Sequence, residues 1–332
     1  MGVRVVGSVG GGRFGLSGAR DRVRRAGYGK WVSRAMVLAA SVRVVGRMLV
    51  PALAVLAVSC GSGKAADPLV VGAQQPAQSR VLAEIYAQAL ARTGTAVRVE
   101  PGVGERAEML AALSAGTVAV AADHNGALLA ELNIGADAET VEAVTEELNC
   151  SLPQDTVTTD PADGTDFEPR VLVTTATAEQ RGIGSVEDLA EQCSGLTAGT
   201  AAVPGLLDLP AVAARISGCE FTATQQFTDP AELRRALVDG RIQVAVLGGP
   251  AEFLPGGTDG LAVLADSGEA IRAQNPVAVL RKGVLDERQT EKLNYVAGEL
   301  TTDELAALVL RVRDEGADPA ELARTWLDAH GL

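Results

Sequence analysis

The chain has 332 residues, of which 47% are hydrophobic and 21% are charged, and its formal net charge is −13. Ten basic residues and one acidic residue precede Cys60, which leaves 19 basic and 41 acidic residues from Cys60 onward, so the net charges are +9 and −22. The acidic part argues against nucleic acid and against an anionic membrane surface as partners. Its length suffices for one or two domains with a sizeable core.

The basic segment before Cys60 indicates export. Residues 48–58 form a continuous apolar run, preceded by Arg43 and Arg47 and followed by Ser59 and Cys60. This order is typical of a signal peptide, and the run is too short to span a bilayer. We therefore predict a signal segment over residues 1–59.

The end of this segment resembles a bacterial lipobox, whose cysteine carries the lipid and becomes the mature N-terminus. Ala57 stands where that motif usually has leucine. We predict lipidation at Cys60 and a flexible tether over residues 60–68. An ordinary signal peptide with an incidental cysteine is the alternative. Because Met36 offers a normal start, we interpret residues 1–35 as a mis-called start.

The next part of the chain alternates between strands and helices. Strands are predicted at 69–71, 97–99 and 118–121, and helices at 80–90, 105–114, 127–132 and more broadly 128–148. Short apolar runs give the strands, and apolar residues at helical spacing give the helices. This order predicts a parallel sheet covered by helices.

A polar crossover over 151–169 leads to a second unit with the same alternation. Strands are predicted at 170–175, 196–199, 221–224 and 242–247, and helices at 185–193, 209–216 and from Asp229 onward. Ser185 with Asp188 forms a capping signal, and Asp229-Pro230 places a cap before an N1 proline.

The last part of the chain contains two short strands and then helices only. Strands are predicted at 261–264 and 277–280, and helices at 287–300, 301–313 and 318–329. A strand-free tail cannot start a third domain, so we expect it to pack on the first unit. The predicted domains are one lobe over 69–169 plus 261–332 and a second lobe over 170–260.

Polar side chains that follow the predicted strands are the candidate ligand groups. In parallel sheets, ligands bind beyond the carboxyl ends of the strands, where helix N-termini converge. The candidates are Gln74, Gln75, Arg106, Asp123, His124 and Asn125 on the first lobe, and Thr200, Gln225, Gln226 and Gly248 on the second.

Two of these candidates are charged, and each has an alternative role. Arg106 is suited to clamp a ligand carboxylate, or it pairs at the surface with Glu105 or Glu108. Asp123 is suited to bind a ligand cation, or it caps the following helix. Together the two charges favour a zwitterionic ligand between the lobes.

Three cysteines follow Cys60. Cys193 and Cys219 each precede a predicted strand of the second unit, and neighbouring strands would bring them to one sheet edge. We favour a Cys193–Cys219 disulfide with Cys150 free, and three separate buried thiols are the alternative.

The sequence offers few parts for catalysis. The chain has only two histidines, and we find no nucleophile motif, metal-binding cluster or credible nucleotide loop. Asp123 with His124 is the one conceivable acid–base pair, but adjacent strand residues point to opposite faces. We therefore expect no enzyme activity, no cofactor and no metal.

Several segments together resemble the osmoprotectant-binding proteins of ABC importers, the OpuAC-like group. These segments are Val71-Gly72, LAEIYAQAL at 82–90, the helix over 104–116, NPVAVLRK at 275–282, and the tail at 300–304 and 318–332. The resemblance implies an α/β periplasmic-binding-protein fold of type II, with two lobes joined by two crossing strands. Each lobe is expected to be a mostly parallel sheet with helices on both faces, closing on ligand.

The resemblance also implies a function. We expect a monomeric, lipid-anchored protein on the outer face of the cytoplasmic membrane, which delivers a small zwitterionic, glycine betaine-like solute to an ABC permease. A non-transporting envelope sensor on the same fold is the alternative. One departure is His124, where the family has an aromatic residue that would help to surround a quaternary ammonium ion. Phe167, Phe227 and Phe253 are the only plausible aromatic walls.

Overall fold

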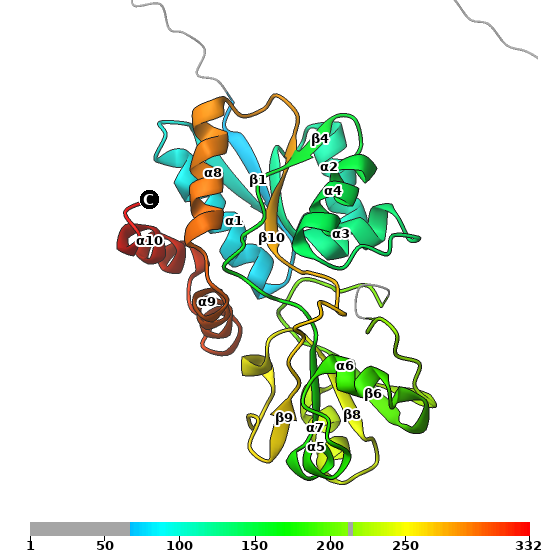
Figure 1. Cartoon of the computed structure of the whole chain (residues 1–332). Helices are drawn as coiled ribbons and strands as arrows, with labels where there is room; N and C mark the ends of the chain where they lie inside the picture. The colour runs from blue at the N-terminus through cyan, green and yellow to red at the C-terminus, as the bar shows by residue number, and fades with distance from the viewer. Residues whose placement is uncertain (1–66, 212–214) are drawn as a thin grey trace, which may run out of the picture. The chain divides into compact units, whose positions relative to one another are not determined.

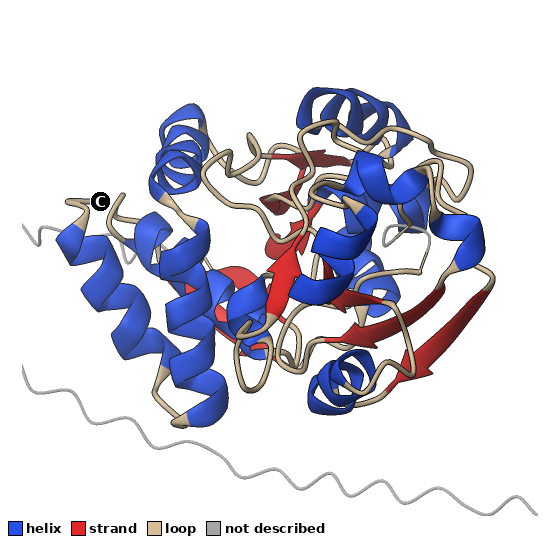
Figure 2. Cartoon of the chain, turned by 60° about the horizontal axis from the view of Figure 1, so that its bottom comes forward, coloured by secondary structure: helices blue, strands red, loops and turns tan. Residues whose placement is uncertain are grey.

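Two five-stranded sheets form the framework of the residues that the structure describes, 67–211 and 215–332. The structure is a computed structural model of the whole chain (Figure 1). The predicted signal segment, Cys60 and the tether before Asp67 lie outside the described residues. In Figure 2, helices surround the strands of both sheets.

The first sheet combines parallel strands with one antiparallel strand. Its order is β2 (Val97–Pro101), β1 (Leu69–Ala73), β3 (Val120–His124), β10 (Pro276–Arg281) and β4 (Thr156–Thr158). β1 runs parallel to β2 and β3, and β10 is antiparallel to both β3 and β4. Four of the five strands therefore point the same way, as expected for a mostly parallel sheet.

Side-chain alternation along these strands creates two separate apolar layers. On β3, Val120 and Ala122 face one layer, whereas Ala121 faces the other. On β10, Ala278 packs in the first layer and Val279 in the second. Helices therefore cover both faces of this sheet.

The helices divide between the two layers according to their apolar faces. α1 (Ala77–Ala91), α8 (Glu287–Glu299), α9 (Thr302–Asp314) and α10 (Pro319–Ala329) pack on one face, and α2 (Arg106–Ala115), α3 (Asn125–Leu132) and α4 (Val141–Ser151) pack on the other. The three C-terminal helices lie against α1, so the tail packs beside the first sheet (Figure 1).

The second sheet repeats the same arrangement. Its order is β7 (Ala223–Phe227), β6 (Thr197–Ala202), β8 (Val244–Gly248), β5 (Arg170–Thr174) and β9 (Leu261–Val263). β6 is parallel to β7 and β8, and β5 is antiparallel to β8 and β9. Its helical elements are α5 (Thr175–Arg181), α6 (Val186–Ala190), η1 (Cys193–Gly195), α7 (Pro230–Val238) and η2 (Ala251–Phe253).

The caps predicted at the starts of α6 and α7 are present. Ser185 and Asp188 form a capping box on α6, and the Asp229 side chain accepts a hydrogen bond from the Ala231 amide at the start of α7. Thr301 caps α9 through the Glu304 amide. In a capping box, the Glu304 carboxylate would accept from the backbone amide of Thr301. Here it accepts instead from the Thr301 hydroxyl and the Trp326 indole.

Several predicted boundaries are wrong. The strand expected at 261–264 in the first lobe is β9, which pairs with β5 in the second sheet. The helix expected over 128–148 is two helices, because Asn133 bonds the Gly135 amide and Thr140 caps α4. The crossover 151–169 contains β4.

The helix predicted over 209–216 is not formed by its described residues. Ile216 forms an isolated β-bridge with Ile271, and the Ser217 amide donates to the Ala270 carbonyl. The Leu207 amide likewise donates to the Gln78 side chain. The backbone groups around this segment therefore bond to distant residues instead of forming a local helical ladder.

Two crossing segments, residues 159–169 and 264–275, connect the sheets. Asn275 joins them: its side-chain amide donates to the Thr165 carbonyl at 2.6 Å, and its backbone amide donates to Asn125 Oδ1 at 2.9 Å. A Cβ at Gly126 would collide with the Ala273 carbonyl, which explains the glycine there.

Cys193 and Cys219 form a disulfide with their Cα atoms 5.4 Å apart, the pairing that the sequence favoured. Cys150 is free and exposed. No helix among the described residues is both long enough and apolar enough to cross a membrane.

Candidate functional site

A cavity of about 1490 Å³ lies over one face of the second sheet. Its floor consists of alternate residues on three neighbouring strands. Thr200 on β6 is in register with Gln226 on β7 and with Val246 on β8, so all three point to the same face. Thr224 and Gly248 extend this floor along β7 and β8.

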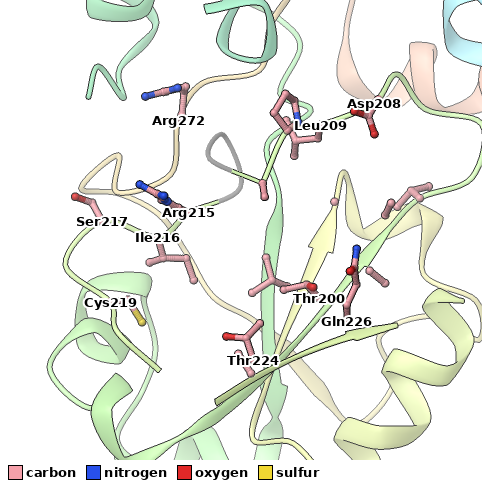
Figure 3. Close-up of a pocket in the computed structure, with 18 of the residues that line it drawn as sticks. Thr200, Asp208, Leu209, Arg215, Ile216, Ser217, Cys219, Thr224, Gln226 and Arg272 are labelled. Atoms are coloured by element: carbon pink, nitrogen blue, oxygen red, sulfur yellow. The ribbon is translucent and has the colours of Figure 1, made fainter. Parts of the chain in front are cut away.

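Charged side chains from the surrounding segments form the walls of the cavity. Figure 3 shows Asp208, Arg215 and Arg272 on segments that surround the strands bearing Thr200, Thr224 and Gln226. Asp137, Glu139 and Glu220 also line the cavity. The Cys193–Cys219 disulfide anchors one wall, because Cys219 is itself a lining residue.

Arg272 is the buried cation of this cavity, with 7% of its surface exposed. Its Nε donates to the Ala138 carbonyl at 2.8 Å, and its Nη2 donates to the Ala136 carbonyl at 2.6 Å. Burial lowers the pKa of its guanidinium, and the nearby carboxylates of Glu147, Glu139 and Asp137 oppose this effect. Arg272 therefore holds the loop between α3 and α4 against the cavity.

Three of the ten candidate ligand groups line the cavity: Thr200, Gln226 and Gly248. Gln225 is exposed on β7, one position from Gln226, so its side chain points to the other face of the strand. The remaining candidates lie at the first sheet and do not line this cavity: Gln74, Gln75, Arg106, Asp123, His124 and Asn125. Contacts between these first-sheet groups and a ligand stay a prediction.

Arg106 and Asp123 bind each other. Arg106 Nε donates to Asp123 Oδ2 at 2.7 Å, and Nη2 donates to Oδ1 at 2.8 Å. The two side chains are 7% and 0% exposed. Burial alone would lower the pKa of Arg106. The charge and hydrogen bonds of Asp123 outweigh this effect and raise the pKa. The two side chains thus form a buried, bidentate ion pair.

The alternative roles considered for these two residues are wrong. Glu105 and Glu108 form the capping box of α2 and do not bind Arg106. The N-cap of α3 is His124, and no side chain caps it. Asp123 is held instead by Arg106 and by the His124 amide, which donates to Asp123 Oδ1 at 2.8 Å.

His124 belongs to a hydrogen-bonded chain that reaches the cavity wall. The Leu207 amide donates to Gln78 Oε1 at 2.9 Å, and Gln78 Nε2 lies 2.9 Å from His124 Nε2. Because Gln78 Nε2 can only donate, His124 Nε2 accepts and the imidazole is neutral. Burial lowers the pKa of His124 to about 4. The negative charge of Asp123 acts in the opposite direction, but its effect is smaller.

This bonding leaves no acid–base pair at Asp123 and His124. The Asp123 carboxylate contacts the His124 backbone amide, and the imidazole binds Gln78 on the other side. The two groups conceived as a catalytic pair are therefore engaged with different partners.

The remaining first-sheet candidates mainly support the backbone. Asn125 Oδ1 accepts from the amides of Gly126 and Asn275. The Gln74 amide donates to Ser79 Oγ, whereas Gln74 Nε2 is buried without a hydrogen-bond partner. Gln75 is exposed.

A match to a family model spans residues 67–329, and its description is the substrate-binding domain of ABC-type glycine betaine transport systems, OpuAC. The chain belongs to the OpuAC family. This family consists of substrate-binding proteins and not of enzymes. No curated protein sequence matches the chain.

Solved structures share the fold of this chain. One is described as a glycine betaine/carnitine/choline ABC transporter; it is 18% identical, with a TM-score of 0.61 over 79% of this chain and 98% of that chain. Another is apo YehZ from Escherichia coli, 18% identical, with a TM-score of 0.57 over 80% of this chain and 99% of that chain. The two-lobed periplasmic-binding-protein fold is therefore confirmed.

Few aromatic side chains line the cavity of this OpuAC-family chain. His124 packs against Phe167 at 5.6 Å between ring centroids, and Phe167 packs against Phe253 at 6.4 Å. Both phenylalanines are buried in the apolar core and do not line the cavity. Among the described lining residues, Phe221 is the only aromatic.

Sequence reasoning missed most of the polar residues that line the cavity, among them Thr224, Asp208, Arg215 and Arg272. Thr224 shares a face with Gln226, and it would have been found if β7 had been placed at Ala223–Phe227. The other three lie on irregular segments, and no local pattern marks them.

Proposed function

We propose that this chain is the substrate-binding protein of an ABC importer and that it captures a small zwitterionic, osmoprotectant-like solute. The observation that carries the proposal is the cavity over β6, β7 and β8 in a chain of the OpuAC family. Hydroxyl and amide groups of Thr200, Thr224 and Gln226 offer hydrogen bonds, and both signs of charge stand on its walls. A few convergent polar groups in a concave site are typical of ligand pockets.

The bound solute would be delivered to a permease at the outer face of the membrane. The signal-like segment and Cys60 support a lipid anchor as the only membrane attachment. Mass spectrometry of the membrane fraction should then find a diacylglyceryl group on an N-terminal Cys60. An unmodified soluble protein that begins upstream of Cys60 would contradict the lipid anchor. The proposal that the protein binds a solute would still stand.

A thermal-shift screen of betaines, choline, amino acids and sugars on the purified protein tests solute capture. A ligand at 100 times its Kd should stabilise the folded protein by about 2.7 kcal/mol. Calorimetry then compares Gln226→Leu with Gln225→Leu, a matched change one position along β7. We expect Gln226→Leu to weaken binding about tenfold and Gln225→Leu to leave it within about twofold.

Two outcomes would contradict the proposal. If no solute in the panel binds, capture of this solute class is wrong. If a solute binds but cells that lack the chain import it normally, delivery to a permease is wrong, and a sensing role becomes the better interpretation.

A further inference from the structure

The cavity carries more acidic than basic groups. Asp137, Glu139, Asp208 and Glu220 line it, against Arg215 and Arg272. Arg272 already donates to two backbone carbonyls, and Glu147 lies near it in addition to the lining acids. The walls therefore favour a solute with a cationic group over one that is purely anionic.

Two kinds of protein group recognise a cationic nitrogen. A fully methylated nitrogen has no N–H group, so it depends on the faces of aromatic rings. An ammonium with N–H groups instead donates charge-assisted hydrogen bonds to carboxylates. With Phe221 as the only aromatic among the described lining residues, this cavity offers carboxylates and no aromatic cage.

Asp208 is a lining acid whose backbone is tied to two helices of the first lobe, α1 and α2. Arg106 Nη2 donates to the Asp208 carbonyl at 2.8 Å, and the preceding amide, Leu207 N, donates to Gln78 at 2.9 Å. Leu207 is also buried, with 4% of its surface exposed. Side chains of α1 and α2 therefore hold the backbone on both sides of this exposed side chain, which lines the cavity.

We infer that the cavity selects zwitterions whose cationic nitrogen carries N–H groups over fully methylated zwitterions, and that Asp208 binds that nitrogen. Thr200, Thr224 and Gln226 then serve as hydrogen-bond partners for the rest of the solute, and Arg215 lies on the wall as a cation for its carboxylate. This inference rests on the proposed function, because it narrows the class of solute that the same site binds.

Calorimetry on the full-length protein in detergent with two methylation series tests the inference. One series is glycine, N-methylglycine, N,N-dimethylglycine and glycine betaine; the other is proline, N-methylproline and N,N-dimethylproline. Every member keeps the carboxylate, and the last member of each series has no N–H. We expect the affinity to fall at least tenfold between the last N–H-bearing member and the fully methylated one.

Asp208→Asn provides the second measurement, with Asp239→Asn as the matched control at an exposed position outside the cavity. We expect Asp208→Asn to weaken the binding of the N–H-bearing members at least tenfold and to remove most of the selectivity between N–H-bearing and fully methylated members. Asp239→Asn should leave the affinity and the selectivity unchanged. Equal or tighter binding of betaines or choline overturns this inference and leaves solute capture standing. No binding of any solute in the wider panel overturns both.

Discussion

Arg106 and Asp123 form a bidentate ion pair at 2.7 and 2.8 Å in which both side chains are buried. The same guanidinium donates a third hydrogen bond to the Asp208 carbonyl at 2.8 Å. The two charges that the sequence assigned to opposite ends of a ligand therefore neutralise each other, and the pair links α2 and β3 to the wall of the cavity.

Arg106→Ala should destabilise the protein by about 3–5 kcal/mol, because it leaves the Asp123 carboxylate buried without its counter-charge. Urea denaturation followed by circular dichroism measures this change in the free energy of unfolding. Arg235→Ala is the control: its pair with Glu232 spans 3.6 Å, and the two side chains are 61% and 54% exposed. We expect the control to cost less than about 1 kcal/mol. Equal effects of the two variants would contradict a structural role for the buried pair.

Replacing His124 should change how stability depends on pH. Burial lowers the pKa of folded His124 to about 4 from its ordinary value of 6.5, so the unfolded chain takes up its proton first as the pH falls. The contribution of neutral His124 is therefore fully present above pH 6.5 and is lost as the pH falls through about 4. Relative to His124→Gln, the wild type should lose about 3 kcal/mol over this window. Stability curves that run parallel for the two proteins would show that His124 is not buried in its neutral form.

Glu168 should have the opposite dependence. Burial and the neighbouring Asp166 raise its pKa to about 8 from 4.5, although Arg170 acts against this shift. The protonated form thus contributes stability that is present below pH 4.5 and lost as the pH rises through about 8. Glu168→Gln, which mimics the protonated acid, should gain about 1 kcal/mol over the wild type for each pH unit in this range.

Glu299→Gln, at an exposed position on α8, is the control for Glu168→Gln. Its stability, measured over the same pH range, is the reference for Glu168→Gln. If Glu168→Gln behaves in the same way, the carboxyl of Glu168 is not held in its protonated form.

The sequence predicts part of the candidate site, as individual residues show. The rule that ligand groups follow parallel strands found Thr200, Gln226 and Gly248, which do line the cavity. The same rule placed Arg106 and Asp123 at the ends of two strands of one sheet, but it could not show that they bind each other, because their separation depends on how α2 packs on β3.

The remaining differences have a common physical cause. The segment around Leu207 and Ile216 bonds to Gln78 and Ile271, residues distant in sequence. Local spacing therefore predicted a helix where the described residues 207–211 and 215–216 form none. Asp208, Arg215 and Arg272 lie on or beside such irregular segments, so their side chains could not be assigned to the site from the sequence.

The disulfide should stabilise the wall that contains Cys219. Cys193 and Cys219 are 26 residues apart in sequence, and closing a loop of this size in the unfolded chain contributes about 2–4 kcal/mol. The Cys193→Ala/Cys219→Ala variant should lose this amount in urea denaturation, and solute binding should weaken because the wall loses its anchor. Cys150→Ser, at the exposed free cysteine, should change neither quantity. Unchanged stability in the double variant would contradict the assigned role.

A crystal structure of the protein with its tightest-binding zwitterion tests the central claim most directly. We expect electron density for the solute in the cavity over β6, β7 and β8, with its cationic nitrogen within hydrogen-bond distance of the Asp208 carboxylate and the Arg106–Asp123 pair intact. Density at the ends of β1 and β3, beside Gln74 and His124, with Arg106 or Asp123 turned to the solute, would contradict it.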